Sequence, residues 1–376
     1  MKVVLAIDSF KGSLSSQRAE DAVECGIKRA VSDADIVSYP IADGGEGLTE
    51  ALIRCMNGKM KETVATDPLG RKISSEYAVA DDGTAIIEMA KAAGITLVDK
   101  SELNPLVATT YGVGELIADA IKNGSRSFIV GLGGSAANDC GIGMLQALGF
   151  EFTDKDGKNV AFGANGVRDV CCISDKNAMP ELSECEFRIA CDVSNPLCGE
   201  KGASMVFAPQ KGATPKMCQM MDEWFFEFAE KVKGFNPDSD MNSPGAGAAG
   251  GTGFALMSFL NARLESGIDM IIDKIGIEND IANADIVVTG EGRIDRQTVM
   301  GKVPGGVSRL AKKYGKTVLA FCGCVSDDAR ECNENGIDAF FPILRQPCSV
   351  EDAMDSDKAY KNLADTSEQV FRLIVK

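Results

Sequence analysis

The stretch KVVLAIDSFKGSLSS, residues 2–16, decides the fold. Its apolar run from Val3 to Ile7 is typical of a buried strand, and the polar turn from Asp8 to Gly12 follows at once. Ser15 or Ser16 could then cap a helix, because apolar residues recur at helical spacing as far as residue 30. Open α/β sheets bind ligands at the carboxyl ends of their strands, so residues 8–12 form the first candidate functional segment.

The same order of strand, glycine-rich loop and helix recurs along the chain. The further units, each given as a strand and its loop, are residues 36–40 with DGGEG at 43–47, residues 128–130 with GLGGSAANDCG at 131–141, and residues 286–289 with GEGRIDRQTVMGK at 290–302. Pro304 begins the helix after the last loop, and Thr317 to Phe321 return as a strand. Such alternation predicts right-handed βαβ units and a parallel sheet covered by helices.

The middle of the chain has a different pattern. Residues 72–89 are typical of paired strands around Asp81-Asp82-Gly83, and residues 150–160 of a hairpin that turns at Asp156-Gly157. We therefore predict an α/β fold of two domains with the active-site cleft between them. The Rossmann-like parallel-sheet domain takes residues 1–63, 106–150 and 281–376, and the second, mixed α/β domain takes residues 64–105 and 151–280.

Composition excludes several classes of protein. The formal charge of −16 is spread along the 376 residues and would repel polyanions, so we expect no nucleic-acid partner. No apolar run is long enough for a signal-peptide core or a bilayer span, so we expect a cytoplasmic protein with no membrane partner. The 13 cysteines would then be reduced thiols.

The absence of histidine restricts the chemistry. It removes imidazole bases, Ser-His-Asp triads and HExxH zinc sites, and leaves acid-base work to Asp, Glu or Lys. No Walker A loop is present, which excludes a P-loop kinase. An anionic substrate would still need cations, and the basic residues within glycine-rich segments are Lys11, Lys201, Lys211, Arg293 and Lys302.

Two glycine patterns have both a structural and a functional interpretation. Gly131-x-Gly133-x-x-Ala136 follows a strand, and either a tight strand-to-helix turn or a cradle of backbone amides for an anion explains it. The neighbouring Asn138-Asp139 pair favours function. Residues 244–253, PGAGAAGGTG, have the composition of a flexible linker, yet a helix follows directly, which favours an anchored loop. Asp192 follows a strand and is either a turn cap or a catalytic or metal-binding carboxylate.

Taken together, these loops resemble the bacterial glycerate kinase family that is neither P-loop nor galactokinase-like. The match covers nearly the whole chain. The motifs that carry it are DSFKGSLS from Asp8, ADGGEG from Ala42, GLGGSAANDCG from Gly131, CDVSNPLCGEKGAS from Cys191, FAPQKGA from Phe207, PGAGAAGG from Pro244 and TGEGRIDRQTVMGKVP from Thr289.

The resemblance implies that the chain phosphorylates D-glycerate with ATP and Mg²⁺, giving 2-phosphoglycerate in organic-acid catabolism, and it leaves a homodimer open. On these motifs we assign Asp192, Lys11 and Arg293 to catalysis and Glu291 and Asp295 to the metal. The residues assigned to substrate are Asp8, Ser9, Asp43, Gly44, Glu46, Ser135, Asn138 and Asp139. Those assigned to the nucleotide are Gly133, Gly134, Gln210, Lys211, Gly245 and Gly247.

In the predicted mechanism, Lys11, Arg293 and loop amides neutralise the glycerate carboxylate and the ATP phosphates, while Asp192 accepts the proton of the substrate hydroxyl. The carboxylates Asp139, Asp192 and Asp295 could exchange these roles. Three positions depart from the family pattern: Ala137 and Leu48 stand where threonine is usual, and Cys140 where glycine is usual.

Two rival functions remain open. A nicotinamide-dependent oxidoreductase would use the loop from Gly131 to Ala136, with Glu151 as the ribose ligand about twenty residues further on. It is disfavoured because Glu151 is predicted in a hairpin. A regulator that binds a sugar acid without turnover would keep the site and lose the chemistry, and Ala137 and Leu48 favour it.

Overall fold

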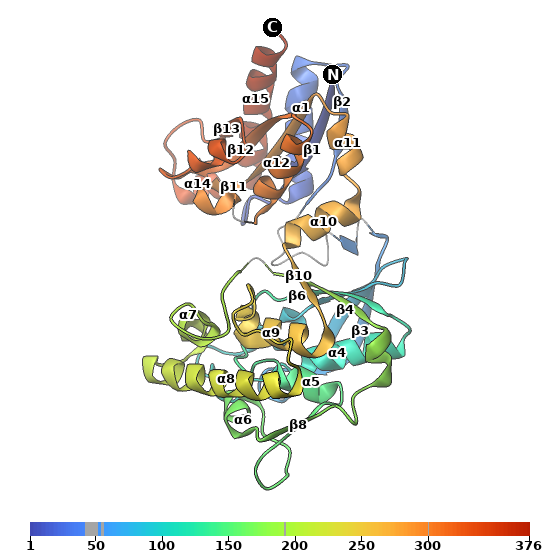
Figure 1. Ribbon diagram of the computed structural model, residues 1–376. Helices are drawn as coiled ribbons and strands as arrows, with labels where there is room; N and C mark the ends of the chain where they lie inside the picture. The colour runs from blue at the N-terminus through green and yellow to red at the C-terminus, as the bar shows by residue number, and fades with distance from the viewer. Residues whose placement is uncertain (42–51, 54–55, 192, 300) are drawn as a thin grey trace. The chain divides into compact units, whose positions relative to one another are not determined.

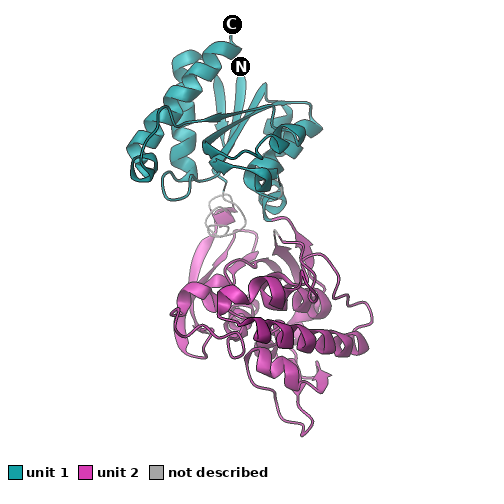
Figure 2. Cartoon of the chain, turned by 90° about the vertical axis from the view of Figure 1, so that its left-hand side faces the viewer, with its two compact units in different colours: residues 1–47, 267–376 teal, residues 48–266 magenta. Residues whose placement is uncertain are grey.

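The computed structural model describes residues 1–41, 52–53, 56–191, 193–299 and 301–376 (Figure 1). Two compact units emerge, and each is described by itself. Unit 1 takes residues 1–47 and 267–376, and unit 2 takes residues 48–266 (Figure 2). The α/β class predicted from the sequence is confirmed.

Unit 1 contains a five-stranded sheet in which every pair of neighbouring strands is parallel. Its strands are β1 (Lys2–Ile7), β2 (Asp35–Ser38), β11 (Ile286–Ile294), β12 (Thr317–Val325) and β13 (Ala339–Pro342). Their order is β13-β12-β11-β1-β2, so the direction of winding reverses between β1 and β11. Ligands of doubly wound sheets bind at such a switch point, beyond the carboxyl ends of the two strands.

Helices cover both faces of this sheet. On one face α1 (Ser16–Ala30) packs along α15 (Ser356–Ile374), and both share a buried cluster with alternate residues of β1, including Val3, Leu5 and Ile7. The intervening residues of β1 point to the other face, where α12 (Val303–Lys313) contacts β1, β11 and β12. The predicted cap of the first helix is confirmed, because Ser15 Oγ accepts from the Arg18 amide at 3.3 Å.

Strand β11 is longer than the sequence indicated. The expected strand ended at Thr289, but β11 continues to Ile294, where Glu291 pairs with Cys322 and Arg293 with Cys324 of β12. The glycines explain this continuation, because a Cβ on Gly290 would lie 2.4 Å from the carbonyl oxygen of Phe321. Glu291 and Arg293 therefore stand on a paired strand instead of a loop.

Unit 2 contains a mixed six-stranded sheet in the order β10-β9-β6-β5-β4-β3. Neighbours from β5 to β10 run parallel, whereas β3, β4 and β5 pair antiparallel, as the pattern around residues 81–83 predicted. The strands are β3 (Lys59–Thr66), β4 (Lys72–Val79), β5 (Ala85–Glu88), β6 (Ser127–Gly131), β9 (Glu186–Ala190) and β10 (Arg263–Glu265).

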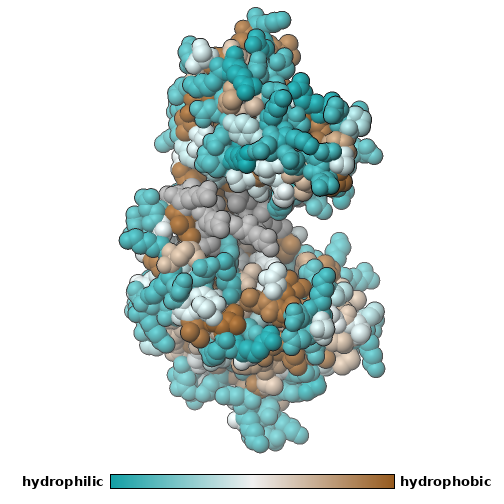
Figure 3. Space-filling model, turned by 180° about the vertical axis from the view of Figure 1, so that it is seen from behind, coloured by the Kyte–Doolittle hydropathy of each residue, from teal (hydrophilic) through white to brown (hydrophobic). Residues whose placement is uncertain are grey.

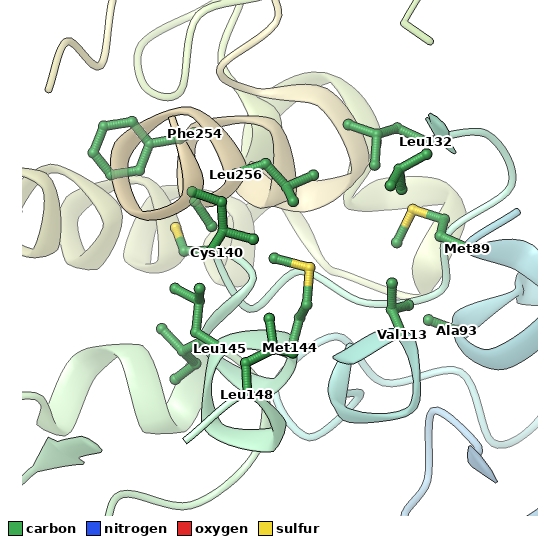
Figure 4. Packing of buried hydrophobic residues seen from close by; sticks show 14 of the residues in the cluster. Met89, Ala93, Val113, Leu132, Cys140, Met144, Leu145, Leu148, Phe254 and Leu256 are labelled. Carbon is green, nitrogen blue, oxygen red and sulfur yellow. The ribbon is translucent and has the colours of Figure 1, made fainter. Parts of the chain in front are cut away.

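The helices of unit 2 enclose one hydrophobic core with the sheet, part of which Figure 4 shows around Met144 and Leu256. They are α3 (Ala90–Ala93), α4 (Tyr111–Lys122), α5 (Ile142–Ala147), α6 (Gly163–Asp169), α7 (Ala203–Phe207), α8 (Pro215–Phe235) and α9 (Ala248–Leu260). Unit 1 also has α10 (Gly267–Ile275), α11 (Glu278–Ala282), α13 (Glu331–Glu334) and α14 (Val350–Met354). Short 3-10 turns occupy Ile95–Leu97, Pro180–Glu184, Pro209–Lys211 and Arg296–Val299.

The division of the chain differs from the predicted domain boundaries. Residues 106–150 belong to unit 2, because β6 pairs with β5 and β9 in the mixed sheet. Unit 1 ends at Gly47 and resumes at Gly267 instead of residues 63 and 281. The predicted hairpin at residues 150–160 is present as a short antiparallel turn, since Thr153 pairs with Asn159 and the Val160 amide donates to the Phe152 carbonyl at 2.9 Å. Its first strand, β7 (Glu151–Thr153), also pairs with β8 (Cys172–Ser174) in a separate two-stranded sheet, which was not predicted.

The described residues contain no helix that is long and apolar enough to cross a bilayer. On the face drawn in Figure 3, hydrophilic residues cover most of unit 1 and hydrophobic ones are scattered among them. This surface fits the net charge of −16.

A buried carboxyl group supports the end of β1. Glu20 on α1 is fully buried, and its Oε1 accepts from the Ile7 amide at 3.1 Å, one residue before Asp8. Its Oε2 has no hydrogen-bond partner among the described residues. Burial, with the nearby charge of Asp21 as a smaller cause, raises the pKa of Glu20 to about 9 even though the Ile7 amide opposes the shift. The side chain is therefore a neutral acid near pH 7.

Replacing Glu20 by glutamine should remove a pH dependence of stability. Because the folded pKa lies above the unfolded value of 4.5, only the folded state keeps the proton between these values, and the free energy of unfolding falls as pH rises. The free energy of unfolding of Glu20→Gln, measured relative to that of wild type, should therefore rise by about 1.4 kcal/mol per pH unit in that window. Urea unfolding at about pH 5.5 and about pH 7.5 measures the difference.

A surface variant provides the control. Lys313 and Tyr314 lower the pKa of Glu278, so this carboxylate is ionised in both states above about pH 5.5, and Glu278→Gln should show a constant difference from wild type. A constant difference for Glu20→Gln as well would show that Glu20 is ionised in the folded protein.

Candidate active site

A pocket of about 660 Å³ lies at the carboxyl edge of the unit 1 sheet. Its lining comes from the carboxyl-terminal parts of β11 and β12 and from the segments that follow β1, β11 and β13, together with α14 and α15. Seven residues singled out from the sequence line it together: Asp8, Ser9, Lys11, Glu291, Arg293, Asp295 and Lys302. The pocket includes the switch point between β1 and β11.

Asp8 is a fixed carboxylate in this pocket. Its amide donates to the Gly290 carbonyl at 2.9 Å, which continues the pairing of β1 with β11 beyond the last strand residue. The Ser9 amide donates to Asp8 Oδ1 at 2.6 Å, and the residue is only 3% exposed. Asp8 therefore presents a preoriented acidic group to a small part of the pocket.

Charges of both signs alternate at the end of β11. Glu291 and Arg293 share a face of the strand, and Asp295 follows in the next turn. Lys302 joins the two acids, since its Nζ lies 3.1 Å from Glu291 Oε2 and 3.9 Å from Asp295 Oδ1. Arg293 Nε lies 3.8 Å from Asp295 Oδ2 and donates to Ser326 Oγ at 2.9 Å. The site thus has cations for phosphate or carboxylate groups beside carboxylates for a metal.

Glu291 is the best-placed metal ligand of the described residues. It is 6% exposed, and its Oε1 is buried with no hydrogen-bond partner in the described part of the chain, while Oε2 pairs with Lys302. Burial raises the pKa of Glu291, whereas Thr298 and Lys302 act to lower it. No group of three or more acidic or cysteine side chains in the described part of the chain could hold a metal alone. Mg²⁺ commonly takes one or two carboxylates and completes its shell with water and phosphate oxygens, which this arrangement suits.

The loop at residues 131–141 in unit 2 is anchored at its base and exposed at its tip. Gly133 and Gly134 are exposed, and Gly134 has φ = 70°, which favours glycine. The Gly134 carbonyl accepts from the Ile95 amide at 2.8 Å, and the Ala136 amide donates to the Ala93 carbonyl at 2.8 Å. The exposed glycine backbone could approach an anion, as the glycine pattern predicted.

Two residues predicted to bind ligands, Asp139 and Lys211, lie behind this loop. Asp139 is fully buried, and its oxygens accept from the Thr110 amide at 2.8 Å and the Gly141 amide at 3.0 Å. Lys211 is 2% exposed and donates to the Ala137 carbonyl at 2.5 Å. Burial lowers the pKa of Lys211 to about 8, against the attraction of Asp139. In this structure both side chains hold the loop from behind, so their contacts with ligands stay predictions.

Asn138 and Ser135 are also turned inward. Asn138 is fully buried and donates to Ser204 Oγ at 3.1 Å, and Ser135 Oγ accepts from the Ala137 amide at 3.1 Å. Gln210, by contrast, is exposed beside the buried Lys211. Asn138 and Ser135 therefore support the shape of the loop in this structure, and ligand binding by these two residues and by Gln210 stays a prediction.

The glycines of residues 244–251 serve close packing. A Cβ on Gly247 would lie 2.2 Å from the Pro196 carbonyl oxygen, and one on Gly245 would lie 2.1 Å from Leu264 Cδ2. Ala249, Gly250 and Gly251 all have left-handed backbone, and the Gly250 carbonyl accepts from the Cys140 amide at 3.0 Å. This segment is an anchored loop packed against the 131–141 loop. Nucleotide binding by Gly245 and Gly247 stays a prediction.

A model described as the glycerate kinase family matches residues 3–375. The chain belongs to the glycerate kinase family. It is 44% identical over 375 residues to a glycerate kinase of Haemophilus influenzae, covering 100% of this chain and 99% of that protein. It is 43% identical over 371 residues to a glycerate 2-kinase of Escherichia coli, covering 98% of this chain and 97% of that protein.

A solved structure agrees with this assignment. A crystal structure from Salmonella typhimurium LT2, provisionally assigned as glycerate kinase 2, matches with a TM-score of 0.86 and 39% identity. The match covers 100% of this chain and 98% of that one. The two-unit α/β chain is thus a member of the glycerate kinase family in both sequence and fold.

The structure explains two departures from the glycerate kinase pattern. Cys140 has φ = 49°, a conformation that favours glycine, so the usual glycine at this position relieves strain that cysteine tolerates here. Ala137 is fully buried, so a threonine hydroxyl there would face protein atoms. Leu48 lies outside the described residues, as do the predicted ligands Asp43, Gly44 and Glu46 and the predicted base Asp192.

Sequence reasoning missed two parts of this glycerate kinase site. Lys302 was noted among the cations but received no role, although it bridges Glu291 and Asp295. The apolar segment that lines the pocket after β13 carried no motif and was not predicted. Its position after the carboxyl end of a strand was the available signal.

Proposed function

We propose that this chain transfers the γ-phosphoryl group of ATP to D-glycerate. Membership of the glycerate kinase family supports the reaction, and the paired charges at the end of β11 are the structural observation that carries it. Phosphoryl transfer depends on positioning and on neutralising developing charge, which this site supplies without histidine. The likeness to a glycerate 2-kinase supports 2-phosphoglycerate as the product.

In this proposal the cations of the pocket bind the anionic groups. Lys11 and Arg293 contact the glycerate carboxylate and the ATP phosphates, and Lys302 keeps Glu291 and Asp295 in place. Asp8 and Ser9 orient the substrate hydroxyls through their fixed hydrogen bond. Glu291 and Asp295 would hold Mg²⁺, which would neutralise phosphate oxygens when bound.

The proton acceptor is assigned to Asp192 on the sequence. The residues that flank it are firmly held, because the Cys191 amide donates to the Glu265 carbonyl at 3.0 Å and Asn195 Nδ2 donates to the Lys201 carbonyl at 2.8 Å. The exposed backbone of Gly133 and Gly134 supplies amides for phosphate oxygens. We also propose that the protein acts in the cytoplasm and keep the homodimer as an expectation.

The oxidoreductase alternative loses its ribose ligand. Glu151 stands on β7 of the small antiparallel sheet, and its Oε1 accepts from Asn177 Nδ2 at 2.7 Å. A ribose ligand should follow the second parallel strand of the dinucleotide-binding unit, where Glu151 does not lie. Adding the protein to NADH should therefore leave the fluorescence of NADH unchanged.

The proposal is tested by ADP formation that depends on D-glycerate. Purified protein with ATP and Mg²⁺ should release ADP when D-glycerate is added and much more slowly without it. A protein that binds D-glycerate in a calorimeter but never releases ADP would be the non-catalytic regulator instead.

The next prediction concerns the contribution of the Lys11 charge to catalytic efficiency. Lys11→Ala should lower kcat/KM by at least about tenfold, because a cation beside the transferred group stabilises the transition state. Lys155→Ala, at an exposed hairpin position in unit 2, is the matched control and should leave kcat/KM unchanged. If both variants keep full efficiency, Lys11 is a surface lysine without a role in the reaction.

A further inference from the structure

The pocket in unit 1 has more room and more apolar surface than the proposed phosphoryl chemistry uses. Its volume of about 660 Å³ falls in the range of sites for drug-sized ligands, far above the needs of a three-carbon acid. Beside the charged residues, the lining includes Leu344, Pro347, Val350 and Met354. We call these four residues the apolar wall.

The apolar wall is exposed to an unusual degree. Leu344 is 38% exposed, Met354 is 43% exposed and Val350 is 80% exposed. Exposed apolar side chains that gather around a pocket mark a surface that a ligand or partner covers. The segments that carry them follow β13 or belong to α14, so they lie at the same carboxyl edge as the charged residues.

The strand order sets the distance between the apolar wall and the charged groups. β13 and β11 are both neighbours of β12, so the ends of β13 and β11 stand about 10 Å apart at usual strand spacing. Contact with the Lys11 loop is nonetheless direct, because a Cβ on Gly12 would lie 2.6 Å from Met354 Cε. A ligand that is anionic at one end and apolar at the other fits this arrangement.

Two amide side chains also line the pocket. Gln346 precedes Pro347 of the apolar wall, and Asn362 lies on α15. Each amide has donor and acceptor groups side by side. This is the pattern that matches the amino group and ring nitrogen of adenine.

We propose that the apolar wall binds the adenine base of the nucleotide, with the triphosphate directed towards Lys11, Arg293 and Lys302. This inference rests on the proposed kinase function and adds to it, since it places the nucleotide base in unit 1 and not on the glycine loops of unit 2. The base is sandwiched by apolar side chains, and Gln346 or Asn362 reads its edge.

Thiol protection tests the proposal without turnover. Cys348 is exposed and lines the same pocket, whereas Cys171 and Cys172 are exposed thiols of unit 2. Alkylation of each thiol by N-ethylmaleimide is followed by peptide mass spectrometry with adenosine, ADP, tripolyphosphate or D-glycerate. At saturation, ADP and adenosine should slow alkylation of Cys348 by about fivefold or more and leave Cys171 and Cys172 unchanged.

The outcomes separate the two proposals. Protection of Cys348 by D-glycerate or tripolyphosphate without protection by adenosine would overturn the adenine assignment, as would no protection by any of them. Protection by ADP and adenosine in a protein that fails to phosphorylate D-glycerate would keep the nucleotide site and reject the proposed function.

A pair of variants gives a second, independent measurement. Leu344→Asp places a charge in the apolar wall and should raise KM for ATP by about tenfold while KM for D-glycerate stays within about twofold. Ile374→Asp, at a C-terminal position that is 40% exposed against 38% for Leu344, is the control and should change neither constant. Equal changes in both KM values with an unchanged Tm would contradict the proposal.

Discussion

Replacing Asp192 by asparagine is expected to lower kcat at least about a hundredfold, because a positioned base contributes that much or more to proton transfer. The change keeps the size of the side chain, so folding and the Kd for ATP should stay near the wild-type values. Rapid-quench or steady-state kinetics at saturating ATP, Mg²⁺ and D-glycerate give kcat, and calorimetry gives the Kd.

Asp240→Asn is the matched control for this prediction. Asp240 lies in unit 2, where its Oδ1 accepts from the Asn242 amide at 2.9 Å and so caps a turn. This variant should keep the wild-type kcat. If Asp192→Asn also keeps it, the proton acceptor is another carboxylate, with Asp8 the best placed of the described residues because it is already fixed within the pocket.

Replacing Glu291 by glutamine should raise the Mg²⁺ concentration for half-maximal rate by about tenfold, because a hard cation loses one anionic oxygen ligand. The buried Oε1 of Glu291, which has no hydrogen-bond partner among the residues that the structure describes, is the group expected to bind the metal. Lys302 retains Asp295 as a partner at 3.9 Å, so the local charges stay partly balanced. Rates measured across a Mg²⁺ titration at fixed ATP test this expectation.

Two further variants make the metal prediction specific. Asp295→Asn should shift the Mg²⁺ requirement in the same direction, whereas Glu278→Gln, whose carboxylate pairs with Lys313 at the surface, should not. An unshifted requirement in both Glu291→Gln and Asp295→Asn would remove these carboxylates from the metal site.

The elements with strong local signals were predictable from the sequence. The apolar run before Asp8 forms β1, and Ser15 caps α1 as its pattern indicated. The extent of β11 was not predictable, because Gly290 and Gly292 resemble loop residues until β12 is known to pair beside them. The sheet that β6 joins was likewise not predictable, because the sequence of a short buried strand does not show which strands it pairs with.

The candidate site was predictable where chemistry and position coincide. Asp8, Lys11, Glu291 and Arg293 were singled out as polar residues after strands, and they do line one pocket. The sequence did not show which of the polar candidate residues are buried. Asp139 and Lys211 look like ligands in a glycine-rich context, but tertiary packing places them behind the loop. The apolar wall lacks any polar signature, and only the pocket reveals it.

The most direct test of the account is the identity of the phosphorylated product. Purified protein is incubated with ATP, Mg²⁺ and D-glycerate, and the mixture is followed by ³¹P NMR with authentic 2- and 3-phosphoglycerate as standards. The account predicts a 2-phosphoglycerate resonance that grows in step with ADP. Formation of ADP with inorganic phosphate alone, or an unchanged ATP spectrum, would contradict it.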